Sequence, residues 1–174
     1  MTYFLGIDQS FTSCGVVVLD EKATLVEKAT IRSLKDGSTD IFDRAWEIAD
    51  TISTNFINSY APEVIGLEGL AFSKFGDATR DLAGLQFTII NYLRHINSYT
   101  KENLLIVSPN ELKKFATTKG NAKKQEMVDS LPQNVLESFQ EANYKKTTGL
   151  YDVTDAYWIA RFILDVSQRT PAAN

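Results

Sequence analysis

Residues 3–31 read YFLGIDQSFTSCGVVVLDEKATLVEKATI, and this stretch decides the fold. It contains three apolar runs, at 3–8, 15–20 and 24–31, that are rich in β-branched and aromatic residues and are separated by short polar segments. Runs of this composition are typical of strands, and such short connections join antiparallel neighbours. The chain is therefore predicted to begin with an antiparallel meander of three strands.

Helical and strand patterns alternate after residue 31. Apolar residues recur at three- and four-residue steps over 39–60 and 77–99, which predicts amphipathic helices. Short apolar runs at 64–67 and 104–107 predict strands that are buried on both faces of a sheet. Capping residues, glycines and prolines predict three more helices, at 109–120, 121–131 and 151–167. This order predicts an α/β protein with a mixed five-stranded sheet and helices on both faces, and it resembles the ribonuclease-H-like fold.

The size and composition favour one domain that covers residues 1–174. A chain of 174 residues, 44% of them hydrophobic and 23% charged, has enough apolar material for a single core. No apolar run approaches the roughly 20 residues of a membrane span, and the N-terminus lacks a basic leader. We therefore expect a cytoplasmic protein with no membrane partner. The single cysteine, Cys14, has no disulfide partner and is expected to be buried.

Basic residues are concentrated in one part of the chain. The formal net charge of -4 argues against a protein that coats nucleic acid by bulk attraction. Nevertheless, five lysines lie within the twelve positions 113–124, and Lys145 and Lys146 form a second group. This distribution favours a nucleic-acid contact at one place on the surface.

Four carboxylates follow apolar runs or open a helix. Asp8 ends the first predicted strand, Glu68 ends the fourth, and Asp152 and Asp155 open the last helix. Acidic residues are unusual directly after buried strands, and groups at the carboxyl ends of neighbouring parallel strands meet beyond the sheet. Residues three apart share a helix face, so Asp152 and Asp155 can point to the same spot. We expect the four carboxylates to converge.

A cluster of four carboxylates implies bound cations. Like charges at close range repel, and a fold normally keeps such a cluster only when cations neutralise it. Oxygen ligands select hard ions such as Mg²⁺ or Mn²⁺, which also bind phosphate oxygens. Two ions about 3.5–4 Å apart can activate a water molecule and stabilise a leaving 3'-oxygen. The predicted chemistry is phosphodiester hydrolysis with two Mg²⁺ ions, for which Mn²⁺ can substitute.

Each carboxylate also has a local structural explanation. Asp152 could cap the N-terminus of the last helix, with Asp155 favoured by the positive end of the helix dipole. Asp8 could begin a turn, and Glu68 could pair with Lys74 in the segment that follows it. The occurrence of all four carboxylates in the order of one fold favours a shared metal site over these separate roles.

Three acidic motifs resemble those of one nuclease family. Residues 6–10 (GIDQS), 65–68 (IGLE) and 152–156 (DVTDA) resemble the first, second and last motifs of the RuvC family, and together they span nearly the whole chain. The resemblance implies a Mg²⁺-dependent endonuclease that resolves four-way (Holliday) or other branched DNA junctions. It assigns metal binding and catalysis to the four carboxylates. A short chain of this kind also suits a phage-type enzyme.

The same resemblance implies roles for lysines and aromatic residues. Lys113 and Lys124 match two family lysines that contact or neutralise phosphate near the metal site, and Lys124 is expected to take part in catalysis. Lys119 is expected to bind nucleic acid. The family places an aromatic side chain in the loop after its glutamate, where it stacks in the open centre of the junction, and Phe72 or Phe75 could serve here. Either phenylalanine could instead fold back into the core.

A homodimer is expected, because a four-way junction offers two symmetric strands to two symmetric active sites. The helix over 77–99 is the predicted interface, since Phe87 and Ile90 lie outside its main apolar stripe of Leu82, Leu85, Ile89, Leu93 and Ile96. The only histidine, His95, is expected to be a surface residue of this helix.

Three other functions fit parts of the sequence. Residues 6–13 also resemble the phosphate loop of sugar kinases and actin-like ATPases, although those proteins use two such domains and this chain supplies one. A ribonuclease or a ribosomal-RNA-processing nuclease could share the fold. A non-catalytic nucleic-acid-binding module could share it too, but the four carboxylates favour an enzyme.

Overall fold

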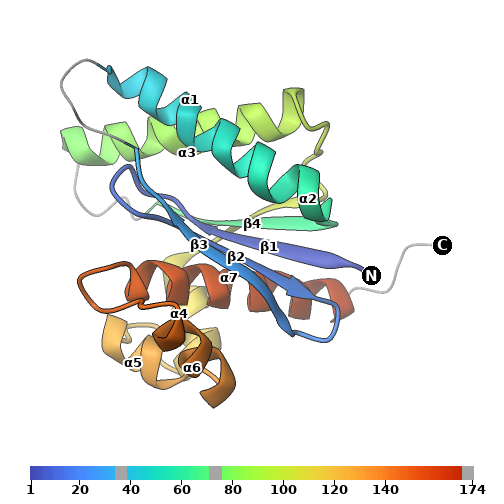
Figure 1. Cartoon of the computed structure of the whole chain (residues 1–174), viewed down its shortest axis with the longest axis vertical. Helices are drawn as coiled ribbons and strands as arrows, with labels where there is room; N and C mark the ends of the chain where they lie inside the picture. Colours follow the sequence, from blue (N-terminus) through green and yellow to red (C-terminus); the bar gives the residue numbers. More distant parts are fainter. Residues whose placement is uncertain (34–38, 71–75, 170–174) are drawn as a thin grey trace.

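The first three strands form the predicted meander. The computed structural model describes residues 1–33, 39–70 and 76–169 (Figure 1). β1 (Tyr3–Asp8) pairs antiparallel with β2 (Cys14–Asp20), and β2 pairs antiparallel with β3 (Leu25–Ile31). The strand boundaries differ from the predicted ones by at most one residue, so the local composition is sufficient to locate them.

Two further strands complete a mixed five-stranded sheet. β4 (Val64–Glu68) lies parallel to β1, and β5 (Leu104–Val107) lies parallel to β4. The strand order is β3-β2-β1-β4-β5, which confirms the predicted mixed sheet. Because β1 and β4 run side by side in the same direction, their last residues, Asp8 and Glu68, lie at the same edge of the sheet.

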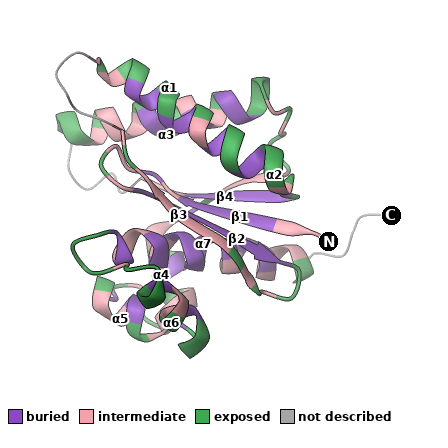
Figure 2. Cartoon of the chain, viewed as in Figure 1, coloured by how far each residue is buried: buried purple, intermediate pink, exposed green. Residues whose placement is uncertain are grey.

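Helices cover both faces of the sheet, as predicted (Figure 1). One layer consists of α1 (Ile41–Ile52), η1 (Ser53–Ile57), α2 (Asn58–Tyr60) and α3 (Asp77–His95). The other consists of α4 (Pro109–Thr117), α5 (Lys124–Asp129), α6 (Gln133–Glu141) and α7 (Leu150–Arg169). Each layer encloses an apolar core against the sheet, and Figure 2 shows buried residues along the strands and on the helices beside them. No helix in the described ranges has the length and apolarity needed to cross a bilayer.

Two glycines let α7 lie directly on the sheet. Side chains of β1 alternate between the faces, so Gly6 faces α7 while Ile7 packs in the α1/α3 core. A Cβ at Gly6 would collide with the backbone carbonyl of Ala156, and a Cβ at Gly15 in β2 would collide with that of Asp152. The first half of α7 therefore packs backbone against backbone on β1 and β2.

Several predicted helix boundaries are wrong. The helix predicted over 39–60 is interrupted by the π-helical turn η1. The helix predicted over 109–120 ends at Thr117, because Thr118 takes a left-handed conformation with a φ of 69°. The helix predicted over 77–99 ends at His95, and the helix predicted over 121–131 covers only Lys124–Asp129. The sequence pattern did not predict α6.

Candidate active site

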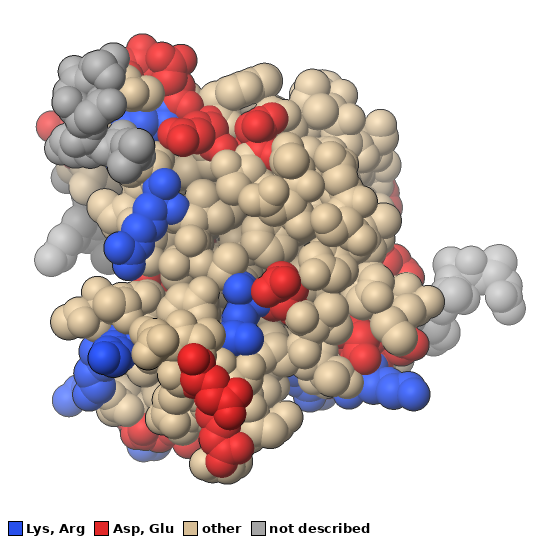
Figure 3. All heavy atoms as spheres, in the orientation of Figure 1, with Lys and Arg blue, Asp and Glu red and all other residues tan. Residues whose placement is uncertain are grey.

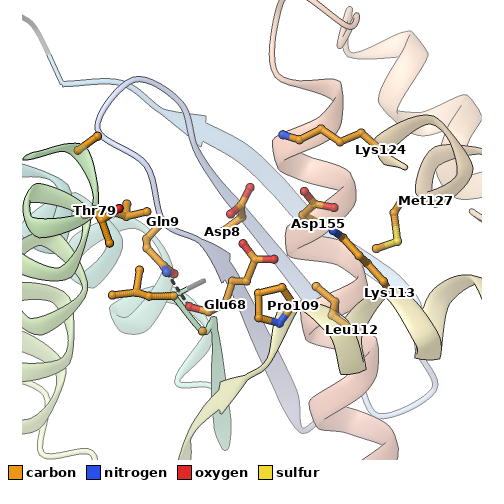
Figure 4. A pocket seen from close by; sticks show the side chains of 14 residues that line it. Asp8, Gln9, Glu68, Thr79, Pro109, Leu112, Lys113, Lys124, Met127 and Asp155 are labelled. Atoms are coloured by element: carbon orange, nitrogen blue, oxygen red, sulfur yellow. Dashed lines mark hydrogen bonds between the residues drawn. The ribbon is translucent and has the colours of Figure 1, made fainter. Parts of the chain in front are cut away.

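Three carboxylates from three elements point toward one another beyond the sheet edge (Figure 4). Asp8 ends β1, and Glu68 ends the adjacent parallel strand β4. Strand alternation turns both side chains toward α7, because Ile7 and Leu67 before them pack in the α1/α3 core. Asp155 lies in the second turn of α7, in the part of that helix that rests directly on the sheet.

The three carboxylates line one pocket of about 430 Å³ together with Lys113 and Lys124. The other lining residues are Gln9, Gly69, Leu70, Ala78, Thr79, Leu82, Pro109, Leu112 and Met127. The pocket thus lies between the carboxyl edge of the sheet, the start of α3, and the helices α4 and α5. Five of the predicted site residues, distant in the sequence, come together here.

Burial raises the pKa values of all three carboxyls, and repulsion from the other carboxylates adds to the shifts of Asp8 and Asp155. Burial has the largest effect on the pKa of Asp8, and the charges of Asp155, Glu68 and Asp152 raise it further. Burial, followed by the charge of Glu68, raises the pKa of Asp155 to about 7. Burial also raises the pKa of Glu68. The cluster therefore resists full ionisation unless positive charge compensates it.

Two lysines supply part of that positive charge. Lys124 acts to lower the pKa values of all three carboxyls, and Lys113 acts to lower those of Glu68 and Asp155, but burial outweighs both lysines. The Lys124 ammonium lies over the Tyr151 ring, 5.6 Å from its centre. A cation over an aromatic face is attracted by the ring, which restrains this otherwise exposed side chain.

A family assignment follows from comparison of the sequence. A profile of the family described as crossover junction endodeoxyribonuclease RuvC matches residues 4–160. The chain belongs to this family. It is therefore a junction-resolving endonuclease, and the predicted resemblance to the RuvC family is confirmed. A comparison with curated protein sequences finds no match.

Solved structures of RuvC proteins share the fold. RuvC of Thermus thermophilus is similar with a TM-score of 0.72 and 15% identity over 96% of each chain. The complex of T. thermophilus RuvC with a Holliday junction substrate gives 0.70 and 16% identity, over 92% of this chain and 91% of that one. The yeast mitochondrial Holliday junction resolvase Ydc2 gives 0.61 and 16% identity, over 92% of this chain and 76% of that one. The predicted ribonuclease-H-like fold is confirmed.

Asp152, the fourth acid of the RuvC motifs, lies beside the cluster. Its charge adds to the effects that raise the pKa values of Asp8 and Asp155, although it is not among the described residues that line the pocket. α7 begins at Leu150, directly after Gly149, whose φ of 101° favours glycine. Asp152 is thus the third helical residue, and the alternative that it caps the helix is wrong.

The remaining predicted residues lie elsewhere. Lys119 Nζ pairs with Glu126 Oε1 at 3.1 Å, and Lys119 is not among the described residues of the pocket wall. Phe72, Phe75 and Lys74 lie outside the described residues. On the face seen in Figure 3, basic side chains form separate groups that are interspersed with acidic ones. A nucleic-acid contact on that face would therefore be confined to a small part of the surface.

Sequence reasoning missed three residues at or beside this candidate site. Gln9, which lines the pocket, donates from Nε2 to the backbone carbonyl of Glu68 at 2.6 Å. Gln86 of α3 donates to the same carbonyl at 2.7 Å. Tyr151 lies under the Lys124 ammonium. Gln9 and Tyr151 adjoin motif acids in the sequence, which is a signal that could have found them, whereas Gln86 lies in a helix away from every motif.

The donor set fits a hard divalent cation. Use of divalent metal is a general property of the RuvC family, and carboxylates with raised pKa values ionise more readily beside a cation. In the described ranges, no three acidic, histidine or cysteine side chains are already grouped as a complete metal-binding set. Mg²⁺ needs only one or two carboxylates and fills its other positions with water and phosphate oxygens, so the donor types of Asp8, Glu68 and Asp155 suit it.

Proposed function

We propose that residues 1–174 form a single cytoplasmic nuclease domain that hydrolyses four-way DNA junctions with Mg²⁺ held by Asp8, Glu68, Asp152 and Asp155. One observation carries the proposal: acids from β1, β4 and α7 line one pocket with two lysines. Strongly raised pKa values in a cleft are typical of functional sites. We propose two ions in each site, with Mn²⁺ as a substitute.

Each part of the pocket has its own task in this proposal. Mg²⁺ held by the four carboxylates would supply activation of a water molecule and stabilisation of the leaving oxygen of the phosphodiester. The carboxylates bind and orient the cation, and their partial burial limits the access of other water. Lys124 neutralises charge on the scissile phosphate, and Lys113 binds a neighbouring phosphate. Lys119 binds DNA outside the pocket.

The proposed substrate is a four-way junction, and a related structure contains T. thermophilus RuvC bound to such a substrate. Phe72 or Phe75 is proposed to stack in the centre of the junction. Stacking contributes about 1–3 kcal/mol per base, so alanine at the stacking position should lower junction cleavage about ten-fold relative to duplex cleavage. Equal effects on junction and duplex for both variants would contradict this role.

We also propose a homodimer, since two symmetric sites would meet the two symmetric strands of the junction. The proposed interface is α3, where Phe87 is 63% exposed, with Phe42 and Trp46 exposed on the adjacent α1. Ile90 supports it less than expected because it packs against the α1/α3 core, whereas Ile96 of the predicted inner stripe is exposed. Sedimentation should give a dimer for the wild type and a monomer for Phe87→Glu. A monomeric wild type at micromolar concentration, with and without junction, would contradict the dimer.

The proposed function is tested by comparing substrates, metals and one matched pair of variants. The substrates are a four-way junction, a linear duplex and an RNA–DNA hybrid, each in Mg²⁺, Mn²⁺ or EDTA. We expect metal-dependent cleavage that strongly prefers the junction. Glu68→Gln should abolish it, whereas Glu63→Gln, an exposed position just before β4, should not. Preferential cleavage of the hybrid would support the ribonuclease alternative, and full activity of Glu68→Gln would remove Glu68 from the site.

A further inference from the structure

Two buried glutamines converge on the backbone of Glu68. Gln9, directly after β1, donates from Nε2 to the Glu68 carbonyl at 2.6 Å, and Gln86 of α3 donates from Nε2 to the same oxygen at 2.7 Å. Their side chains are only 5% and 7% exposed. A carbonyl oxygen has two lone pairs and can accept both bonds at once. Two separate elements therefore hold the end of β4.

The position of this carbonyl explains why side chains are needed. The pairing of β1 with β4 ends at Ile7 and Leu67, one residue before Glu68. Glu68 still pairs with Val107 of β5, but beyond the last β1–β4 pair its carbonyl accepts its hydrogen bonds from the two side-chain amides. Both bonds use Nε2 as the donor, and the buried Oε1 of Gln9 has no partner in the described part of the chain. An unpaired buried acceptor is costly, so this arrangement gives up stability at Gln9 while fixing Glu68.

The two glutamines bind the main chain of Glu68 and not its carboxylate, Gln9 from the wall of the pocket and Gln86 from α3. Leu67 packs in the α1/α3 core, and the alternation of β4 turns the Glu68 carboxylate toward α7. Gln86 reaches the strand end from α3, in the α1/α3 layer. The amides therefore hold the main chain of Glu68 through hydrogen bonds to its carbonyl, and its carboxylate is left available to bind a ligand.

We propose that Gln9 and Gln86 are positioning residues that set the direction of the Glu68 carboxylate by fixing the backbone at the end of β4. This inference rests on the proposed function, in which that carboxylate binds the divalent cation. Neither amide needs to touch the cation or the DNA. Because both act through one carbonyl, either amide alone retains part of the constraint, and loss of both removes it.

The variants Gln9→Met and Gln86→Met, alone and combined, test this role. Methionine keeps the volume of the side chain and removes the donor. Groups that orient a metal ligand typically contribute about 10–100-fold to metal affinity or activity, and we expect a loss in that range for the double variant. Each single variant should lose much less, so the two effects should be strongly non-additive. Gln168→Met is the matched control, because Gln168 Nε2 donates to the backbone carbonyl of Glu21 at 3.0 Å, far from the site.

Three measurements separate positioning from plain stability. Mn²⁺ binding to the DNA-free protein, followed by electron paramagnetic resonance, reports the cation site without catalysis. The Mg²⁺ concentration for half-maximal junction cleavage should rise while the rate at saturating Mg²⁺ recovers. Thermal unfolding of every variant identifies losses that come only from misfolding. If the double variant does not fold, the single variants still give the test, since each should shift Mn²⁺ binding measurably.

Each result has a defined meaning for the inference. Unchanged Mn²⁺ affinity in folded variants, or metal requirements equal to those of Gln168→Met, would overturn it. Additive losses would also overturn it, because they would mean that the two amides do not share one target. The proposed function fails separately, through retained cleavage in Glu68→Gln. Wild-type metal binding in the glutamine variants together with an inactive Glu68→Gln would refute the positioning role and leave the proposed function intact.

Discussion

The acidic half and the basic half of the pocket are built differently. Asp8 and Glu68 end two central strands, and Asp155 lies on α7 where that helix packs backbone against backbone on the sheet. Lys113 and Lys124 lie instead on the short helices α4 and α5, and Lys124 is exposed. The core thus fixes the groups proposed to hold cations, whereas the groups proposed to meet phosphate lie on peripheral helices, where the Lys124 side chain is restrained by its contact with the Tyr151 ring. Substitutions in the two halves should therefore differ in kind as well as in size.

The largest effect is expected in the acidic half, for Asp155→Asn. This change keeps the shape of the side chain and removes one charge from the pocket. Loss of a group that only supports a metal ligand costs about 10–100-fold, so loss of a ligand should lower single-turnover junction cleavage by more than about 100-fold. Asp152→Asn should lower cleavage too, but by less, because Asp152 adjoins the pocket. Binding of the junction without metal should persist or tighten in both variants, since a repulsive charge has been removed.

Asp165→Asn serves as the control for these two variants. Asp165 lies further along α7, where its carboxylate pairs with Arg169 at 2.9 Å. Exposed pairs of this kind contribute roughly 1 kcal/mol or less, so cleavage should stay near the wild-type rate. Full Mg²⁺-dependent activity in Asp155→Asn would contradict the metal-ligand role, and an equal loss in Asp165→Asn would point to damage to the helix.

The basic half should show a smaller and salt-dependent effect. Lys124→Ala is expected to lower cleavage by about ten- to a hundred-fold, because a charge close to the phosphate is lost. Lys113→Ala should lower it less. Each phosphate contact contributes about -0.9 to the slope of log affinity against log salt, so each variant should flatten that slope by about one. Lys119→Ala serves as the comparison, because Lys119 lies outside the pocket in an ion pair with Glu126. Its cleavage rate at saturating DNA should change only slightly.

The measurement is junction binding and cleavage over a range of salt concentrations. A loss of rate without a change in slope would make Lys124 a catalytic group that does not contribute to binding. Unchanged rates and slopes for both Lys113→Ala and Lys124→Ala would mean that these lysines are solvated surface residues with no role in DNA binding or cleavage. The contrast between the two halves would then be removed.

The acidic half of the pocket was predictable because it depends on strands. The apolar runs locate the ends of β1 and β4 within one residue, and the two-residue period of a strand determines which face Asp8 and Glu68 share. The fold then supplies the adjacency of the two strands. Asp155 was predicted from its motif and from the helix face that it shares with Asp152, and Gly6 allows that helix to lie directly on the sheet.

The parts that could not be predicted depend on contacts between side chains of distant elements. Gln86 reaches Glu68 only through tertiary packing, and no local pattern marks it. The boundaries of the helices were inaccurate because residues such as Thr118 end a helix by adopting a left-handed conformation that their identity does not favour. The exposure of Ile96 has the same origin, since α3 ends at His95 before the apolar pattern does.

Gly6→Ala tests whether close packing fixes the acidic half. The added Cβ would meet the backbone of α7 at Ala156 and Ala160, which cannot yield as a flexible side chain would. Overpacking of this kind typically costs about 1–3 kcal/mol, measured as a lower free energy of unfolding in urea. Gly84→Ala in α3 is the opposite case, because a Cβ there meets nothing within 4 Å and should add about 0.5–1 kcal/mol. Equal stability of the two variants would mean that α7 can shift without cost.

The smallest effect is expected from pH, in the metal-free protein. The raised pKa values of Asp8, Glu68 and Asp155, the last at about 7, mean that the folded state holds more protons than the unfolded state, in which carboxyls titrate near about 4. Stability should therefore be highest below about pH 4 and fall as the pH rises from there through about 7. The lowered pKa of Glu126, held down by a hydrogen bond from the Lys123 backbone, acts only at lower pH. In EDTA, the melting temperature of the wild type should drop by a few degrees across this window, and that of Asp155→Asn should drop less. Mg²⁺ should raise the melting temperature of the wild type at pH 8 but not at pH 5. A melting temperature that rises with pH in EDTA, or an identical drop in Asp155→Asn, would mean that ionisation of the acidic half does not destabilise the metal-free protein.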